Sequence, residues 1–233
     1  FHRLKCSMVT EWEDGFFWVK NNPGSVGAGN IEAVFQDIET YDSKYRGIKL
    51  EGGGIVGRNF RCYTTLTDNG LDDSYRVKNS GFKNILIDGC TRSICQVVSN
   101  GGDKIPQNNF FINIDVVNSS GSTYGLHIHE GMENTLIEMS NLGSTPGVVV
   151  FSDASGTIIR NCTVPGTIDR RSSTTIINTV YGNLVGSGGG FVITSLSPLQ
   201  SSMFVDMAGK NYRPAEGSAL IAVGTDSDLE FDL

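Results

Sequence analysis

The chain has 233 residues and a formal net charge of −7, with 29 glycines and only 18% charged residues. The acidic balance and the lack of Lys/Arg clusters argue against a nucleic-acid-binding protein. No apolar run reaches the roughly 18 residues that a membrane-spanning helix needs. Plentiful glycine predicts many turns, and the length suits one solenoid or one large domain.

Residues 1–29 concentrate aromatic side chains, at Trp12, Phe16, Phe17 and Trp18. The Asn-Asn-Pro-Gly sequence at residues 21–24 predicts a turn. We expect an atypical first coil whose aromatic residues pack in a core or an interface, or, as an alternative, lie exposed and stack on sugars. Because the chain opens inside this coil, we expect it to be a piece of a longer protein.

Asparagine then recurs before short apolar runs at a nearly constant interval. Asn59, Asn84, Asn109 and Asn134 are 25 residues apart, and Asn30 precedes Asn59 by 29 residues. The runs are four to six residues long and are cut by Gly, Asn, Ser and Asp, which is typical of strands and turns. A period of this size indicates a solenoid. We therefore expect an all-β parallel β-helix whose stacked asparagines pair from coil to coil.

The coils shorten toward the C-terminus. We expect coils at residues 30–58, 59–83, 84–108, 109–133 and 134–155, followed by shorter ones that begin near residues 157 and 175. Second strands are expected at residues 46–50, 75–78, 94–98, 124–130 and 148–151. The predicted organisation is a helix of coils over residues 1–183, and then a Gly/Ser-rich linker and closing segment over residues 184–233.

Alternation along the first strand of each coil predicts which side chains face inward. The inward set is Ile31, Ala33, Phe35, Phe60, Cys62, Thr64, Ile85, Ile87, Gly89, Phe110, Ile112, Ile114, Thr135, Ile137 and Met139. The outward position two residues after each asparagine is nevertheless apolar at Leu86, Phe111, Leu136 and Ile158. A contiguous outward apolar stripe usually marks a partner. We interpret it as a homo-oligomer interface, with the alternative that another segment of the chain, such as the C-terminal tail, covers it.

This repeat resembles the right-handed single-stranded parallel β-helix (pectate-lyase-like) superfamily, and most of all phage tailspikes and related extracellular proteins. The resemblance covers most of residues 30–180 and includes no catalytic signature. Residues 204–225 are similar to a closing segment of such proteins, with Phe204-Val205-Asp206, Asn211-Tyr212-Arg213 and a Gly-Ser pair at 217–218. Ala219 stands where proline is usual. The resemblance implies an extracellular or virion location and a homotrimer.

The second strands suggest a place for chemistry. When they are aligned on Leu50, Val77 and Ile128, a column of cationic side chains is expected to face outward. Such a column suits an anionic polysaccharide, and a lyase would also need a base and cations that stabilise an enolate. The catalytic candidates are His127, His129, Arg76 and Asp73, and the substrate-binding candidates are Lys49, Lys78, Glu130 and Tyr124.

Each of these assignments has an alternative. Two histidines on an exposed strand are commonly plain surface residues, and His127 and His129 lack a clear third metal ligand. Hydrolysis needs two carboxylates, for which Asp72 and Asp73 are the best pair, although adjacent acids in a turn are usually just solvated. We expect no metal and no cofactor, and no motif indicates Ca²⁺.

The favoured interpretation is an extracellular or virion-attached protein that engages cell-surface polysaccharide and possesses no membrane span. One alternative is a secreted polysaccharide lyase or glycoside hydrolase. A further alternative is a structural shaft without a ligand. The fold analogy alone does not decide among them.

Overall fold

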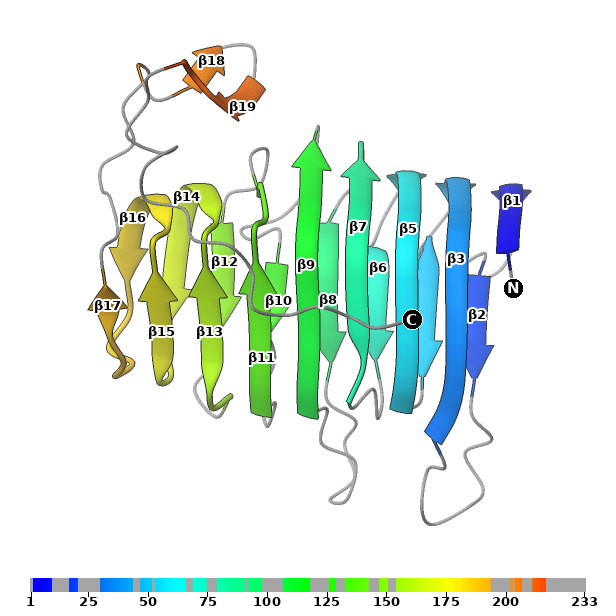
Figure 1. Ribbon diagram of the computed structural model, residues 1–233, viewed down its shortest axis with the longest axis horizontal. Helices are drawn as coiled ribbons and strands as arrows, with labels where there is room; N and C mark the ends of the chain where they lie inside the picture. Colours follow the sequence, from blue (N-terminus) through cyan, green and yellow to red (C-terminus); the bar gives the residue numbers. More distant parts are fainter. Residues whose placement is uncertain are drawn as a thin grey trace.

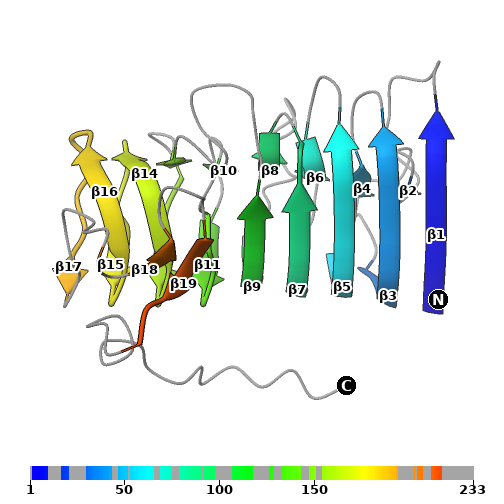
Figure 2. The same cartoon turned by 90° about the horizontal axis from the view of Figure 1, so that it is seen from above.

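The computed structural model describes residues 2–9, 17–20, 30–43, 47–51, 53–65, 69–74, 79–90, 92–97, 107–117, 126–128, 133–142, 147–150, 154–193, 202, 204–206 and 211–216. These residues are almost entirely β-strand. In the described part of the chain they form two long sheets and one two-stranded sheet (Figures 1 and 2).

The first sheet consists of β1 His2–Val9, β3 Asn30–Ser43, β5 Gly53–Thr65, β7 Gly81–Asp88, β9 Gln107–Val117, β11 Glu133–Glu138, β13 Thr157–Arg160, β15 Thr174–Ile177 and β17 Val192–Ile193. The second sheet consists of β2 Phe17–Lys20, β4 Ile48–Glu51, β6 Asn69–Ser74, β8 Arg92–Val97, β10 Leu126–Ile128, β12 Gly147–Val150, β14 Thr163–Arg170 and β16 Val180–Val185. Successive strands alternate between the two sheets, and each described pairing within these sheets is parallel. The expected all-β, parallel architecture is therefore confirmed. We call one first-sheet strand and the second-sheet strand that follows it a repeat.

The spacing from one repeat to the next varies along the first sheet. Contacts between neighbouring strands join Glu39 to Arg61 at a sequence separation of 22, Asn59 to Asn84 at 25, and Asn84 to Asn113 at 29. The expected constant interval is therefore correct for β5 and β7 but wrong for β7 and β9. The difference in chain length falls between the strands, which remain paired.

The corners of the strands carry a ladder of polar side chains. Asp37, Asn59, Asn84 and Asn113 have positive φ angles of 57°, 53°, 59° and 55°. Asparagine tolerates this left-handed conformation better than most residues. Each amide Nδ2 donates to the preceding repeat: Asn59 to Asp37 at 2.8 Å, Asn84 to Asn59 at 3.0 Å and Asn113 to Asn84 at 2.8 Å. We call this the first ladder.

A second ladder lies near the start of β7, β9 and β11. Asn79, Asn108 and Asn134 also have positive φ angles. Asn108 donates to Asn79 at 2.9 Å, and Asn134 donates to Asn108 at 3.1 Å. The expected pairing of asparagines is thus present. Asn109, however, belongs to neither ladder, because it is buried and accepts a hydrogen bond from the backbone N–H of Ser80.

The first ladder is interrupted at Met139. Its register position matches Asn113 and Asn161, and its φ is 46° although its side chain cannot continue the amide chain. Asn161 Nδ2 instead donates to Oε1 of Glu138 at 3.4 Å. Met139 is 38% exposed, so the expectation that it faces inward is wrong.

Inward side chains from both sheets form one apolar core that runs from β3 to β16. Phe82 and Phe111 are register partners whose rings stack with centroids 5.2 Å apart. Gly57 precedes Phe82 in the same column, and a Cβ atom there would approach Phe60 and Phe82 to 2.7 Å. The absence of a side chain at Gly57 therefore makes room for two phenylalanine rings.

Most of the predicted inward residues are confirmed as core residues. Those that lie in the continuous core are Phe35, Phe60, Cys62, Ile85, Ile87, Ile114 and Ile137. Thr135 is also buried. Cys62, Cys90 and Cys162 are buried reduced cysteines, which confirms the interpretation of Cys62 as a small core residue.

The two-stranded sheet is an antiparallel hairpin of β18 Phe204–Asp206 and β19 Asn211–Pro214. In both views it lies level with β11–β14 along the long axis rather than beyond β17 (Figures 1 and 2). Residues 217–225, the second half of the predicted closing segment, lie outside the described residues. The parallel pairing itself continues through β17, where Val192 and Ile193 pair with β15.

Candidate functional site

The strands of the second sheet pair in a different register from the one that predicts the cationic column. Lys49 pairs with Asp72, Asp72 with Cys95, and Cys95 with His127. Leu50 pairs with Asp73 and not with Val77, so the expected alignment of the second strands is wrong at this position. Arg76, Lys78, Tyr124, His129 and Glu130 lie outside the described residues. The described backbone therefore places Lys49 and His127 in one column, with an aspartate and a cysteine position between them.

The outward apolar stripe also consists of different residues from those predicted. Phe111 is only 1% exposed and lies in the core, so the expectation that it faces outward is wrong. Leu86 pairs with Arg61 and Asp115 on the later half of the strands, out of line with Leu136. The residue that lines up with Leu136 and Ile158 is Phe110, which was expected to face inward. Both errors follow from the longer step between β7 and β9.

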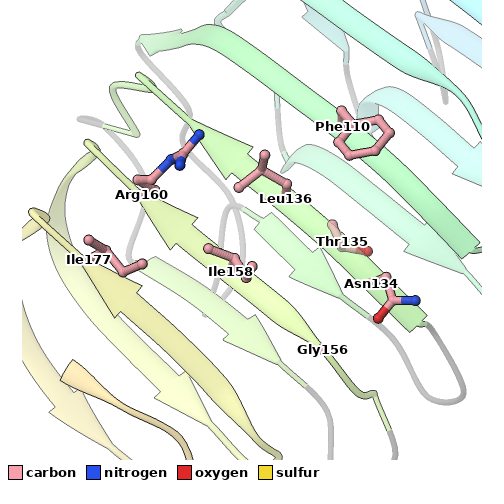
Figure 3. A pocket seen from close by; sticks show the side chains of 8 residues that line it. All are labelled: Phe110, Asn134, Thr135, Leu136, Gly156, Ile158, Arg160 and Ile177. Carbon is pink, nitrogen blue, oxygen red and sulfur yellow. The ribbon is translucent and has the colours of Figure 1, made fainter. Parts of the chain in front are cut away.

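Phe110, Leu136 and Ile158 lie in a line from strand to strand in a hollow of about 360 Å³ on the outer face of the first sheet (Figure 3). Asn134 and Gly156 lie toward one end of this hollow, and Arg160 and Ile177 toward the other. We call it the apolar groove. Its lining residues come from β9, β11, β13, β15 and the residue before β13. Register aligns Phe110, Leu136 and Ile158 in one column, and Arg160 with Ile177 in the next.

A second outward column runs beside the apolar groove. Register places Arg58, Lys83, Ile112, Glu138 and Arg160 in it. Arg160 Nε lies 2.7 Å from Oε1 of Glu138, whose side chain is fully buried. A charge pair of this kind needs good geometry to offset its desolvation. Ile112 and Leu136 are buried too, yet they stand apart from the continuous core cluster.

The outer face of β3, β5 and β7 carries a different set of side chains. Tyr41 and Tyr63 are register partners whose rings stack at a centroid distance of 4.8 Å and an angle of 9°. They alternate with the buried Thr40 and Cys62, so they belong to the outer face. Asp88 is the next residue in their column.

Charged groups surround the two rings. The Tyr41 hydroxyl donates to Glu39 Oε2 at 2.9 Å, and Arg61 Nη1 donates to Glu39 Oε1 at 2.8 Å. The Arg61 side chain is 52% exposed. Partial burial raises the pKa of Tyr63, and the guanidinium of Arg61 opposes that rise. We call Glu39, Tyr41, Arg61, Tyr63 and Asp88 the tyrosine surface.

Sequence reasoning missed this surface although its signal is present. Glu39-Thr40-Tyr41 and Arg61-Cys62-Tyr63 match position by position, as register partners on β3 and β5. The predicted register paired Asn59 with Asn30, which placed the two tyrosines out of step. Asp37 is the true partner of Asn59.

The described residues contain no group of three His, Cys, Asp or Glu side chains that could hold a metal ion. In the same part of the chain, no helix is long and apolar enough to cross a membrane. A scan against protein-family models, a search of curated proteins and a search of solved structures each find no match to this chain.

Proposed function

We propose that this protein is a right-handed parallel β-helix that engages cell-surface polysaccharide, as a spike-type protein does, through the tyrosine surface. The observation that carries the proposal is the stacked pair Tyr41 and Tyr63, placed on the outer face beside Glu39 and Arg61. Aromatic rings bind the C–H faces of sugar rings, and the neighbouring carboxylates and guanidinium can hydrogen-bond the hydroxyl groups.

The charges of the tyrosine surface favour a neutral, hydroxyl-rich glycan. Glu39 and Arg61 neutralise each other in an ion pair, and Asp88 adds one further negative charge. A polyanionic chain would be repelled by that carboxylate. A neutral glycan differs from the anionic polysaccharide that the cationic column of the second sheet predicts.

The parallel architecture supports a repetitive ligand. Equivalent outer-face residues recur from strand to strand at about 4.8 Å. A polysaccharide is itself repetitive, so successive sugar units can meet successive repeats of the same face. An extracellular or virion location belongs to this proposal, because that is where such glycans are met.

Retention on immobilised polysaccharides tests the proposal. The panel contains neutral chains (dextran and galactomannan), bacterial O-antigen, and anionic chains (polygalacturonate and alginate). We expect retention on at least one neutral glycan or O-antigen, and its loss when Tyr41 and Tyr63 are both changed to alanine. Retention on none of the five, or retention that survives the double change, would contradict the proposal.

The same incubations separate binding from catalysis. A lyase releases unsaturated uronates and a hydrolase releases new reducing ends, whereas a binding protein releases neither. The homotrimer that the spike resemblance implies also stays a prediction. Light scattering decides it, because the chain mass is 25.1 kDa and a trimer has three times that mass.

A further inference from the structure

The outer face of β9 and β11 holds side chains that are buried without belonging to the core. Ile112 is 1% exposed and Leu136 is 9% exposed, and the Glu138 carboxylate beside them is fully buried. Phe110, in line with Leu136, is half-buried, whereas Ile158 on the next strand is 36% exposed. An apolar outer face of this extent is a binding surface in most proteins.

We propose that the segment Asp228–Leu233 of the same chain binds the apolar groove as an extended strand. These residues, which lie outside the described part, read Asp-Leu-Glu-Phe-Asp-Leu. Strict alternation of this kind puts Leu229, Phe231 and Leu233 on one face of a strand and the three acids on the other.

The dimensions of the segment and the apolar groove agree. Alternate side chains of a strand are about 6.8 Å apart, so Leu229 and Leu233 are separated by roughly 14 Å. The apolar groove crosses four strands, and at about 4.8 Å per step its width is also roughly 14 Å. Three apolar side chains of the segment can therefore cover Phe110, Leu136 and Ile158.

The charges agree as well. The column that borders the apolar groove pairs Arg160 with Glu138 and continues beyond the groove onto β7 and β5 with the cations Lys83 and Arg58, in a chain whose net charge is −7. Residues 226–233 contain four acids and no cation. Opposite charges fix the orientation of such a contact and disfavour wrong partners. The inference does not depend on glycan binding.

Photocrosslinking of the full chain tests the contact directly. Phe231 is replaced by p-benzoylphenylalanine, and the crosslinked peptides are identified by mass spectrometry. We expect crosslinks to the peptides that contain Leu136 or Ile158. The matched control places the same group at position 230, on the acidic face, where these crosslinks should be strongly reduced. Crosslinks from position 231 to other parts of the chain, or equal patterns from both positions, would overturn the proposal.

An equal mixture of ¹⁴N- and ¹⁵N-labelled protein identifies the source of the segment. Crosslinked peptide pairs in which both peptides carry the same isotope, with no mixed pairs, support binding within one chain. Crosslinks of mixed isotope would show that a second copy fills the apolar groove and would overturn the same-chain assignment.

Hydrogen exchange provides a measurement that requires no reactive group. In the full chain, Phe231→Ser should speed amide exchange of residues 228–233 by about tenfold or more, while protection of β3 and β5, which lie outside the apolar groove, stays unchanged. Glu230→Gln, on the opposite face, should leave the exchange of the segment as it is. Exchange of the segment that is already at the unprotected rate in the unaltered chain would contradict the proposal.

Discussion

Asn113 Nδ2 donates a hydrogen bond of 2.8 Å to Oδ1 of Asn84, although 29 residues separate them in the chain. The contact belongs to the register between β7 and β9, in which Phe111 pairs with Phe82 and Phe110 pairs with Gly81. In this register Phe111 lies in the core and Phe110 lines the apolar groove.

The first ladder should contribute measurably to stability. Asn84 donates to Asn59 and accepts from Asn113, and its φ is 59°. Asn84→Ala should lower the free energy of unfolding by about 1–3 kcal/mol, because two hydrogen bonds and a residue tolerant of the left-handed region are lost. Asn84→Gly keeps the backbone freedom and should cost less. Chemical denaturation measures both, and a glycine variant less stable than the alanine variant would contradict this account.

Restoring the ladder should stabilise the protein. Met139 occupies the interrupted position between Asn113 and Asn161 with a φ of 46°. Met139→Asn should raise the free energy of unfolding by about 0.5–2 kcal/mol, through new amide hydrogen bonds and relief of an unfavourable φ. Met139→Gly serves as the control, since it relieves φ without restoring amide contacts. A melting midpoint that falls in the asparagine variant would argue against the ladder as a source of stability.

How much of this molecule the sequence predicts depends on which signal is read. Apolar alternation identifies the inward residues Phe60, Ile85, Ile87 and Ile137, because burial selects residue type at every second position. The all-β, parallel architecture follows from the repeat and the turn residues. The number of residues from one repeat to the next does not follow from the repeat, because loops of different length are compatible with the same stacked strands.

Asn109 shows why even spacing in the sequence does not identify the corner residues. Asn109 continues the even spacing of Asn59 and Asn84 along the sequence, but Asn108 and Asn113 hold the two positive-φ corners. Asn109 faces the interior and accepts the N–H of Ser80. A single sequence cannot tell a corner asparagine from a buried one, since both satisfy backbone groups. The predicted catalytic residues depended on a second register of the same kind, in which Leu50 was aligned with Val77 and not with Asp73.

Gly57 should not tolerate a side chain. Its Cβ would lie 2.7 Å from the rings of Phe60 and Phe82. Gly57→Ala should therefore lower the free energy of unfolding by about 1–3 kcal/mol through overpacking. Gly189→Ala is the matched control, because a Cβ there meets no atom within 4 Å. Equal melting midpoints for the two variants would contradict the packing described around Gly57.

The buried thiols should be inert in the folded protein. Burial raises the pKa of Cys162 from 9.0 to about 12, and burial together with the nearby Cys90 raises the pKa of Cys62. In a variant with serine at positions 6 and 95, iodoacetamide at pH 8 should label Cys62, Cys90 and Cys162 only after unfolding. Rapid labelling of the native protein would contradict their burial.

The same thiols imply a pH dependence of stability at alkaline pH. A raised pKa in the folded state means that the folded protein holds the proton longer than the unfolded chain does. The stability that depends on the neutral thiols is therefore complete below about pH 9 and falls as the pH rises toward 12. Cys162→Ala should flatten this fall, and urea denaturation at a series of alkaline pH values measures it.

A calorimetric titration of the retained polysaccharide against the full chain and two variants tests directly whether the tyrosine surface binds glycan. Changing Tyr41 and Tyr63 together to alanine should weaken binding about tenfold or more, which corresponds to about 1.4 kcal/mol. Binding should not change in Phe191→Ala, an aromatic residue that is 72% exposed and adjoins β17 at the other end of the first sheet. Equal affinity in all three proteins would contradict the assignment of glycan binding to Tyr41 and Tyr63.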